Sequence, residues 1–136
     1  MAKSKHPSSS TPVEPTQPSL QRVEGFASKY ANNVRYEATV HDLKLIFGES
    51  DQAAGSEVVK QHTSITVPWT VAKLTRYYLD INLLLHEVYV DKIKVAPNQM
   101  PLPFPEPTEE AIANDPLALK AYQLASKVRQ EFVETS

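Results

Sequence analysis

A chain of 136 residues with a net charge of -2 and a pI of about 6.1 forms one ordinary domain or less, and has no strong electrostatic pull toward nucleic acid or an anionic membrane. The chain has no cysteine, which excludes disulfides, thiol nucleophiles and cysteine-based zinc sites and fits a reducing, cytoplasmic environment. Residues 1–6 include two lysines and a histidine, but no apolar run follows them, so we expect no secretory signal. No apolar window in the sequence is long enough to span a bilayer.

The prolines divide the chain into four parts. Residues 1–25 are rich in Ser, Pro, Thr and Gln and predict a disordered arm, with a binding tail as the alternative. Residues 26–95 are poor in proline and predict the core domain, residues 96–107 a proline-rich linker, and residues 108–136 a C-terminal helical segment. Such a small core is marginal alone, so oligomerisation or an added helix would have to supply buried area.

Three strands are expected in the core domain. The first, residues 30–39, alternates apolar and polar side chains, and a tight connection at His41 and Asp42 leads to a second strand that ends at Gly48. A polar loop at residues 50–60 precedes the third strand, residues 58–67. This spacing predicts a three-stranded antiparallel meander.

One long helix is expected from Pro68 to about Val90, because proline fits the first turn of a helix and apolar residues then recur at steps of three and four. That stripe consists of Val71, Leu74, Tyr78, Ile81, Leu85 and Val88. Leu83 and Leu84 sit toward the other side, so the helix is apolar on more than one face. Such a helix usually meets two surfaces. We expect its own sheet to be one, and the same helix of another subunit is a candidate for the second.

The C-terminal part predicts a second helical region. Alternating prolines make residues 96–107 stiff and extended, and a short helix is expected from Thr108. Asp115 and Pro116 then read as the cap and first residue of an amphipathic helix that needs a surface to bury on. Its apolar stripe consists of Leu117, Ala121, Leu124, Val128 and Phe132. The fold class is therefore α+β: a three-stranded antiparallel meander, one long helix and a C-terminal amphipathic helix, which the linker swings out from the core.

Residues 30–93 contain several short motifs: the Tyr-Ala-Asn-Asn-Val and Asp-Leu-Lys-Leu-Ile-Phe-Gly strands, Val67-Pro68 at the helix entry, Ala72-Lys73-Leu74, and the helix ending at residues 86–93. In these motifs the segment resembles the bacterial domain of unknown function 3467. Asp91 stands where the family usually has glycine, and His86 replaces an aromatic residue. The resemblance implies a small sheet-plus-helix domain that self-associates, and it implies no reaction.

The sequence contains no pattern typical of a catalytic site. The four histidines, His6, His41, His62 and His86, lack the spacing of metal ligands, and none of Gly25, Gly48 and Gly55 lies in a nucleophile elbow or a phosphate-binding loop. We therefore predict no catalytic, cofactor-binding or metal-binding residue, and no enzyme.

A nucleic-acid surface is the weaker binding hypothesis. Its candidates are Lys29, Arg35 and Lys44 beside Tyr30 and Tyr36. Acidic residues interleave with this set, so we expect a solvated face of mixed charge.

Protein binding is the better-supported class, because Trp and Tyr anchor interfaces. The predicted interface residues are Trp69, Tyr77, Leu83 and Leu84 on the long helix, and Leu117, Leu124, Val128 and Phe132 on the C-terminal helix. The alternative is that the aromatic residues belong to the core over the sheet. The sequence thus predicts a non-catalytic interaction or assembly module that is a homo-oligomer, with its C-terminal helix docked on a neighbouring subunit or another protein. The alternatives are a chaperone-like binder of extended polypeptide segments and a weak nucleic-acid binder.

Overall fold

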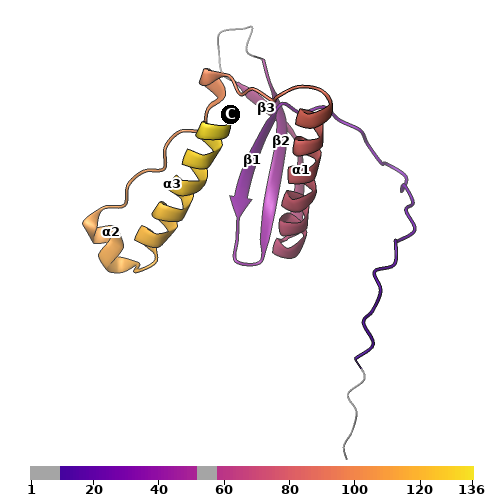
Figure 1. Ribbon diagram of the computed structural model, residues 1–136, viewed down its shortest axis with the longest axis horizontal. Helices are drawn as coiled ribbons and strands as arrows, with labels where there is room; N and C mark the ends of the chain where they lie inside the picture. The colour runs from indigo at the N-terminus through magenta and orange to yellow at the C-terminus, as the bar shows by residue number, and fades with distance from the viewer. Residues whose placement is uncertain (1–9, 52–57) are drawn as a thin grey trace, which may run out of the picture. The chain divides into compact units, whose positions relative to one another are not determined.

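The computed structural model describes residues 10–51 and 58–136. The elements follow the chain in this order: β1 (Asn33–Ala38), β2 (Asp42–Ser50), β3 (Val59–Pro68), α1 (Trp69–Tyr89), η2 (Pro97–Gln99), α2 (Glu109–Asn114) and α3 (Ala118–Thr135) (Figure 1). The strands form one three-stranded antiparallel sheet in the order β1-β2-β3. The predicted α+β class, with a long helix after the sheet and a helix at the C-terminus, is confirmed. Residues 1–9 of the predicted arm and 52–57 of the predicted loop lie outside the described residues.

The chain divides into two compact units, each described by itself. The first comprises residues 1–35 and 46–63, and the second comprises residues 36–45 and 64–136. Side-chain hydrogen bonds hold the strand ends of the first unit. The Asn32 amide donates to Ser50 O at 3.1 Å and accepts from Ser50 N at 2.7 Å, and Asn32 N donates to Gly48 O at 3.1 Å. Asn32 therefore extends the pairing of β1 with β2 by one residue.

Gly48 lies inside β2, so the prediction that the strand ends there is wrong. A Cβ atom at this position would lie 2.7 Å from Lys60 O and 3.0 Å from Val59 Cγ1. Glycine is required here because the backbone of β3 approaches closely, and the missing side chain allows the ladder to continue to Ser50. A glycine that ends a strand and one that admits a neighbouring backbone look the same in sequence.

Replacing Gly48 with alanine should destabilise the fold, because a backbone carbonyl cannot move aside as a flexible side chain can. We expect a loss of about 1–3 kcal/mol in the free energy of unfolding, measured by urea denaturation at a fixed protein concentration. Its neighbour Glu49 is exposed, so Glu49→Ala serves as the control and should leave the midpoint within error. An unchanged midpoint for Gly48→Ala would contradict the close approach of β3.

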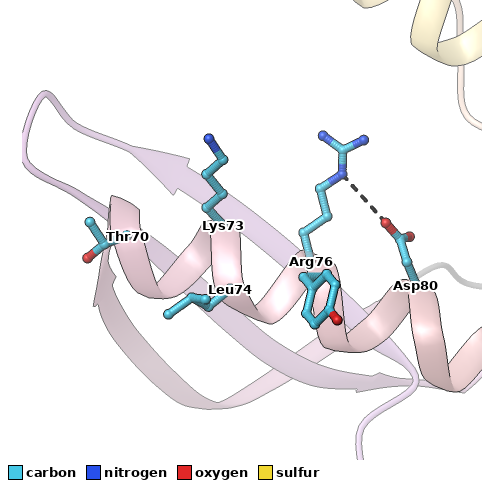
Figure 2. A pocket seen from close by; sticks show the side chains of 6 residues that line it. Thr70, Lys73, Leu74, Arg76 and Asp80 are labelled. Carbon is cyan, nitrogen blue, oxygen red and sulfur yellow. Dashed lines mark ion pairs between the residues drawn. The ribbon is translucent and has the colours of Figure 1, made fainter. Parts of the chain in front are cut away.

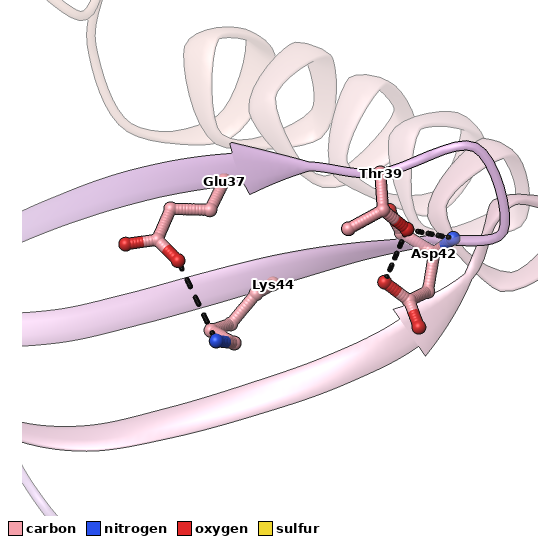
Figure 3. Close-up of polar contacts among 4 residues, drawn as sticks. All are labelled: Glu37, Thr39, Asp42 and Lys44. Carbon is pink, nitrogen blue, oxygen red and sulfur yellow. Dashed lines mark hydrogen bonds and ion pairs between the residues drawn. The ribbon is translucent and has the colours of Figure 1, made fainter.

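Thr39 organises the β1–β2 connection (Figure 3). Its hydroxyl donates to Asp42 Oδ1 at 2.8 Å and accepts from the backbone N–H groups of Asp42 and His41 at 3.1 and 3.2 Å. Thr39 N also donates to Asp42 O at 2.9 Å. The turn therefore lies at Val40 and His41, and Asp42 already belongs to β2, one residue earlier than expected.

α1 follows β3 without a loop. Pro68 is its N-cap in an extended conformation, so the expected start at this proline is off by one residue. Trp69 Nε1 donates to Thr39 O at 3.1 Å, which ties the first residue of α1 to the β1–β2 hairpin. The start of α1 is thus held by the Trp69 side chain as well as by the direct connection from β3.

The C-terminal helices differ from expectation at one boundary. The short helix expected from Thr108 is α2, and Thr108 is its N-cap, because its hydroxyl accepts from Ala111 N at 3.1 Å. α3 begins at Ala118 and not at Pro116, because Asp115 caps a turn: its carboxylate accepts from Leu117 N at 3.0 Å and its carbonyl from Ala118 N at 3.1 Å. The C-cap of one helix and the entry to the next thus share one aspartate.

The proline-rich segment 97–107, called the strap below, is bound to α3. Arg129 Nε donates to Pro101 O at 3.0 Å, and α2 packs against α3. The strap and α2 therefore belong to the same packed segment as α3, and the predicted swing of α3 out from the core stays a prediction. No helix in residues 10–51 and 58–136 is long and apolar enough to cross a membrane.

Candidate interaction surface

The described part of the chain buries no large side chain. Among residues 10–51 and 58–136, Gly48 is the only one that is buried. The leucines and valines of both long helices, α1 and α3, are all exposed. A folded domain usually buries side chains of these types, so their exposure marks surface that is available to a partner.

One face of α1 forms a continuous apolar surface. At about 100° per residue, five side chains share this face. They are Leu74, Tyr77, Ile81, Leu84 and Val88, called the α1 stripe below. Their exposed fractions run from 36% for Ile81 to 76% for Val88. The Tyr77 ring also meets Tyr78 edge-on, with centroids 5.2 Å apart. A surface of this kind on a soluble protein is typical of an interface.

A charged flank runs beside the α1 stripe. It consists of Lys73, Arg76, Asp80 and Glu87, which are all the Lys, Arg, Asp and Glu residues of the helix. They fall within an arc of about 60°. The two cations precede the two anions along the chain, so the flank is positive toward the N-terminus of α1 and negative toward its C-terminus.

A shallow hollow lies where the stripe meets the flank (Figure 2). It is lined by Thr70, Lys73, Leu74, Arg76, Tyr77 and Asp80, all from α1. Arg76 Nε and Asp80 Oδ2 pair across its rim at 3.9 Å, with side chains 84% and 63% exposed. A cation four residues before an anion is the less favourable order in a helix, and an exposed pair of this kind contributes little. Both charges therefore remain available to a partner.

α3 carries a second uncovered stripe. Its half-buried residues, among them Tyr122, Ala125 and Arg129, share one face, and Arg129 on this face is bonded to Pro101 of the strap. The predicted anchors lie on another face, where every member is exposed. They are Leu117, Ala121, Leu124, Val128 and Phe132, called the α3 stripe below. One apolar side of α3 thus remains open.

The structure divides the predicted interface residues of α1 into two groups. Tyr77 and Leu84 lie together on the α1 stripe. Trp69 falls within the arc of the charged flank and Leu83 just beyond it, and Trp69 is hydrogen-bonded to Thr39 of its own chain. Leu74, Ile81 and Val88 complete the stripe. The sequence marked these three as apolar and periodic but did not assign them to the interface, because periodicity alone cannot tell a covered face from an open one.

Residues of the segment that resembles the family form hydrogen bonds and an ion pair within the sheet region. Asn32 joins β1 to β2, as described above. His62 Nε2 donates to Tyr30 O at 2.9 Å, which leaves Nδ1 to accept from the Thr63 hydroxyl at 2.8 Å. Lys44, a member of the hypothetical basic face, pairs with Glu37 at 3.5 Å (Figure 3). Within residues 10–51 and 58–136, no three His, Cys, Asp or Glu side chains gather as metal ligands would.

Comparison of the chain with protein-family models, curated proteins and solved structures found no match. The resemblance of residues 30–93 to the domain of unknown function 3467 stays a prediction. The two uncovered stripes and their charges are the features of this chain that point to a function.

Proposed function

We propose that the protein is a non-catalytic assembly module that acts in the cytoplasm as a homo-oligomer, with α1 and α3 as its contact surfaces. The observation that carries this proposal is the absence of a buried apolar side chain from residues 10–51 and 58–136. A folded chain needs buried apolar surface to offset the conformational entropy that it loses on folding. A partner that covers the two stripes supplies that surface.

The free energy that burial of the two stripes would contribute supports self-association. Fully burying one leucine, isoleucine or valine contributes about 1.5–3 kcal/mol, and seven of the ten side chains in the two stripes are of these types. The net charge of -2 opposes the approach of identical chains only weakly. Oligomerisation is one way in which a small domain completes an apolar core, and it is the one that needs no disulfide or metal.

Light scattering of the purified full-length chain should give a mass of two or more copies of the 15.2 kDa chain. Replacing Leu124 and Val128 with aspartate should shift that mass toward a single copy, because charge on the α3 stripe cannot be buried. Leu20→Asp is the control, since Leu20 is 89% exposed and outside both helices, and it should not change the mass. A single-copy mass for the unmodified chain at every concentration would contradict the proposal.

The open edge of β3 favours a second candidate, a chaperone-like binder of extended polypeptide segments. β3 has a neighbour on one side only, and its ten residues contain a single charge, Lys60. The other edge strand, β1, has Arg35 and Glu37 among six residues. Charges and short length protect sheet edges from adding a strand, so β3 is the less protected edge.

This candidate is tested by fluorescence anisotropy with a labelled apolar peptide. If β3 accepts a strand, Thr66→Lys should lower the affinity several-fold, and Arg35→Lys, which keeps the charge on β1, should not. Binding should be insensitive to salt, because backbone pairing and apolar contact are not screened. Equal affinity of both variants would remove the candidate, and a steep loss of binding with salt would instead favour an electrostatic ligand such as nucleic acid.

A further inference from the structure

The charges of α1 and α3 match each other in one antiparallel register. Along α1 the charged residues Lys73, Arg76, Asp80 and Glu87 are separated by steps of three, four and seven residues. Read backward from its C-terminus, α3 has Glu134, Glu131, Lys127 and Lys120, which are separated by the same three steps. The sign at every position of one series is opposite to the sign in the other.

Because the sequence separations are equal, the matched residues lie at the same height along two antiparallel helix axes. Every residue of an α-helix adds about 1.5 Å of rise, so two antiparallel helices keep this register along their whole length. The pairs are Lys73 with Glu134, Arg76 with Glu131, Asp80 with Lys127, and Glu87 with Lys120. A parallel arrangement would set like charges at the same end, since both helices are positive toward the N-terminus.

One further charge of α3 lies outside this match. It is Arg129, whose guanidinium is already bonded to Pro101 of the strap. Arg129 lies on the half-buried face of α3, away from the row formed by the other four charges. Every Lys, Arg, Asp and Glu side chain of α1 has a counterpart in that row.

The apolar stripes agree with the same register. On both helices the charges flank the stripe on the same hand when each helix is viewed from its N-terminus. Antiparallel packing brings same-hand flanks together, so the charge pairs form one row along the edge of an apolar seam. In this seam Leu84 falls between Ala121 and Leu124, Ile81 between Leu124 and Val128, and Tyr77 between Val128 and Phe132. Phe132 reaches the level of Leu74, at the hollow of Figure 2.

We propose that the α3 stripe of one copy docks antiparallel on the α1 stripe of a second copy, in the register set by the four charge pairs, and that the second copy returns the same contact. This assignment rests on the proposed self-association. The strap and α2 contact α3, so the three form one packed segment. Exchange of this segment between two identical chains gives a closed twofold dimer, as in domain swapping. Both stripes of both copies are then covered.

The absence of native cysteine makes a disulfide test clean. Leu84→Cys and Leu124→Cys introduced together in the full chain should give a covalent dimer on mild oxidation, because the register brings these Cα atoms within the roughly 7 Å that a disulfide needs. The matched control pairs Leu84→Cys with Leu119→Cys, which lies on the face of α3 opposite the stripe and should not cross-link efficiently.

Each outcome decides a different part of the inference. A covalent dimer supports the exchange. A disulfide within one chain would overturn the second copy as occupant, and equal cross-linking of both cysteine pairs, or none of either, would overturn the register. Light scattering of the unmodified chain is measured alongside, so that a multiple-copy mass without the disulfide dimer sinks this inference and leaves the proposed function standing.

Charge reversal gives a second, independent test with surface residues only. One variant carries Asp80→Lys and Glu87→Lys, and the other carries Lys120→Glu and Lys127→Glu. Each alone should associate on the order of 10-fold more weakly than the unmodified chain, because every contact then sets like charges together. An equimolar mixture should regain the unmodified affinity, since both contacts of a mixed dimer again join opposite charges. Failure of the mixture to recover, with each variant weakened alone, would overturn exchange between copies.

Discussion

α1 carries more apolar surface than its own chain covers, and most of the other features follow from this constraint. Its first residue is fixed by the hydrogen bond from Trp69 to the hairpin carbonyl of Thr39. Beyond that point the side chains of Leu74, Tyr77 and Leu84 remain exposed. A helix in this state is stable when another apolar surface of matching length packs on it, because helices in proteins gain most of their stability from such packing. The 18 residues of α3 provide a surface of comparable length.

The strap is bonded to one face of α3, and the α3 stripe lies on another. A free amphipathic helix can turn any side to a partner, but Arg129, on the half-buried face of α3, is held by Pro101. The prolines keep this segment extended at low entropic cost. The result is a pre-organised docking element: its apolar stripe is exposed and its other four charges lie along one flank. Pre-organisation of this kind lowers the ordering cost of association.

Periodicity was sufficient to predict the order and type of the strands and long helices, because residues alternating by two or by three and four report which side of an element is apolar. The end of β2 was wrong because distant atoms decide it: Gly48 lies inside the strand, next to Lys60 O of β3. The bond between Arg129 and Pro101, which are 28 positions apart, has no periodic signal in the sequence either. The predicted interface stays a prediction. Leu124 and Val128 were chosen for their spacing, and spacing could not show that the indole of Trp69 is hydrogen-bonded to Thr39 of its own chain.

Hydrogen exchange of the α1 amides tests the central claim most directly, since it follows the helix itself at different degrees of association. If a second copy covers the α1 stripe, exchange at residues 74–84 should slow as the protein concentration is raised through the dissociation constant, while exchange in the exposed segment 10–25 stays unchanged. Exchange rates in α1 that are the same at every concentration, in a chain whose mass is that of one copy, would contradict the account.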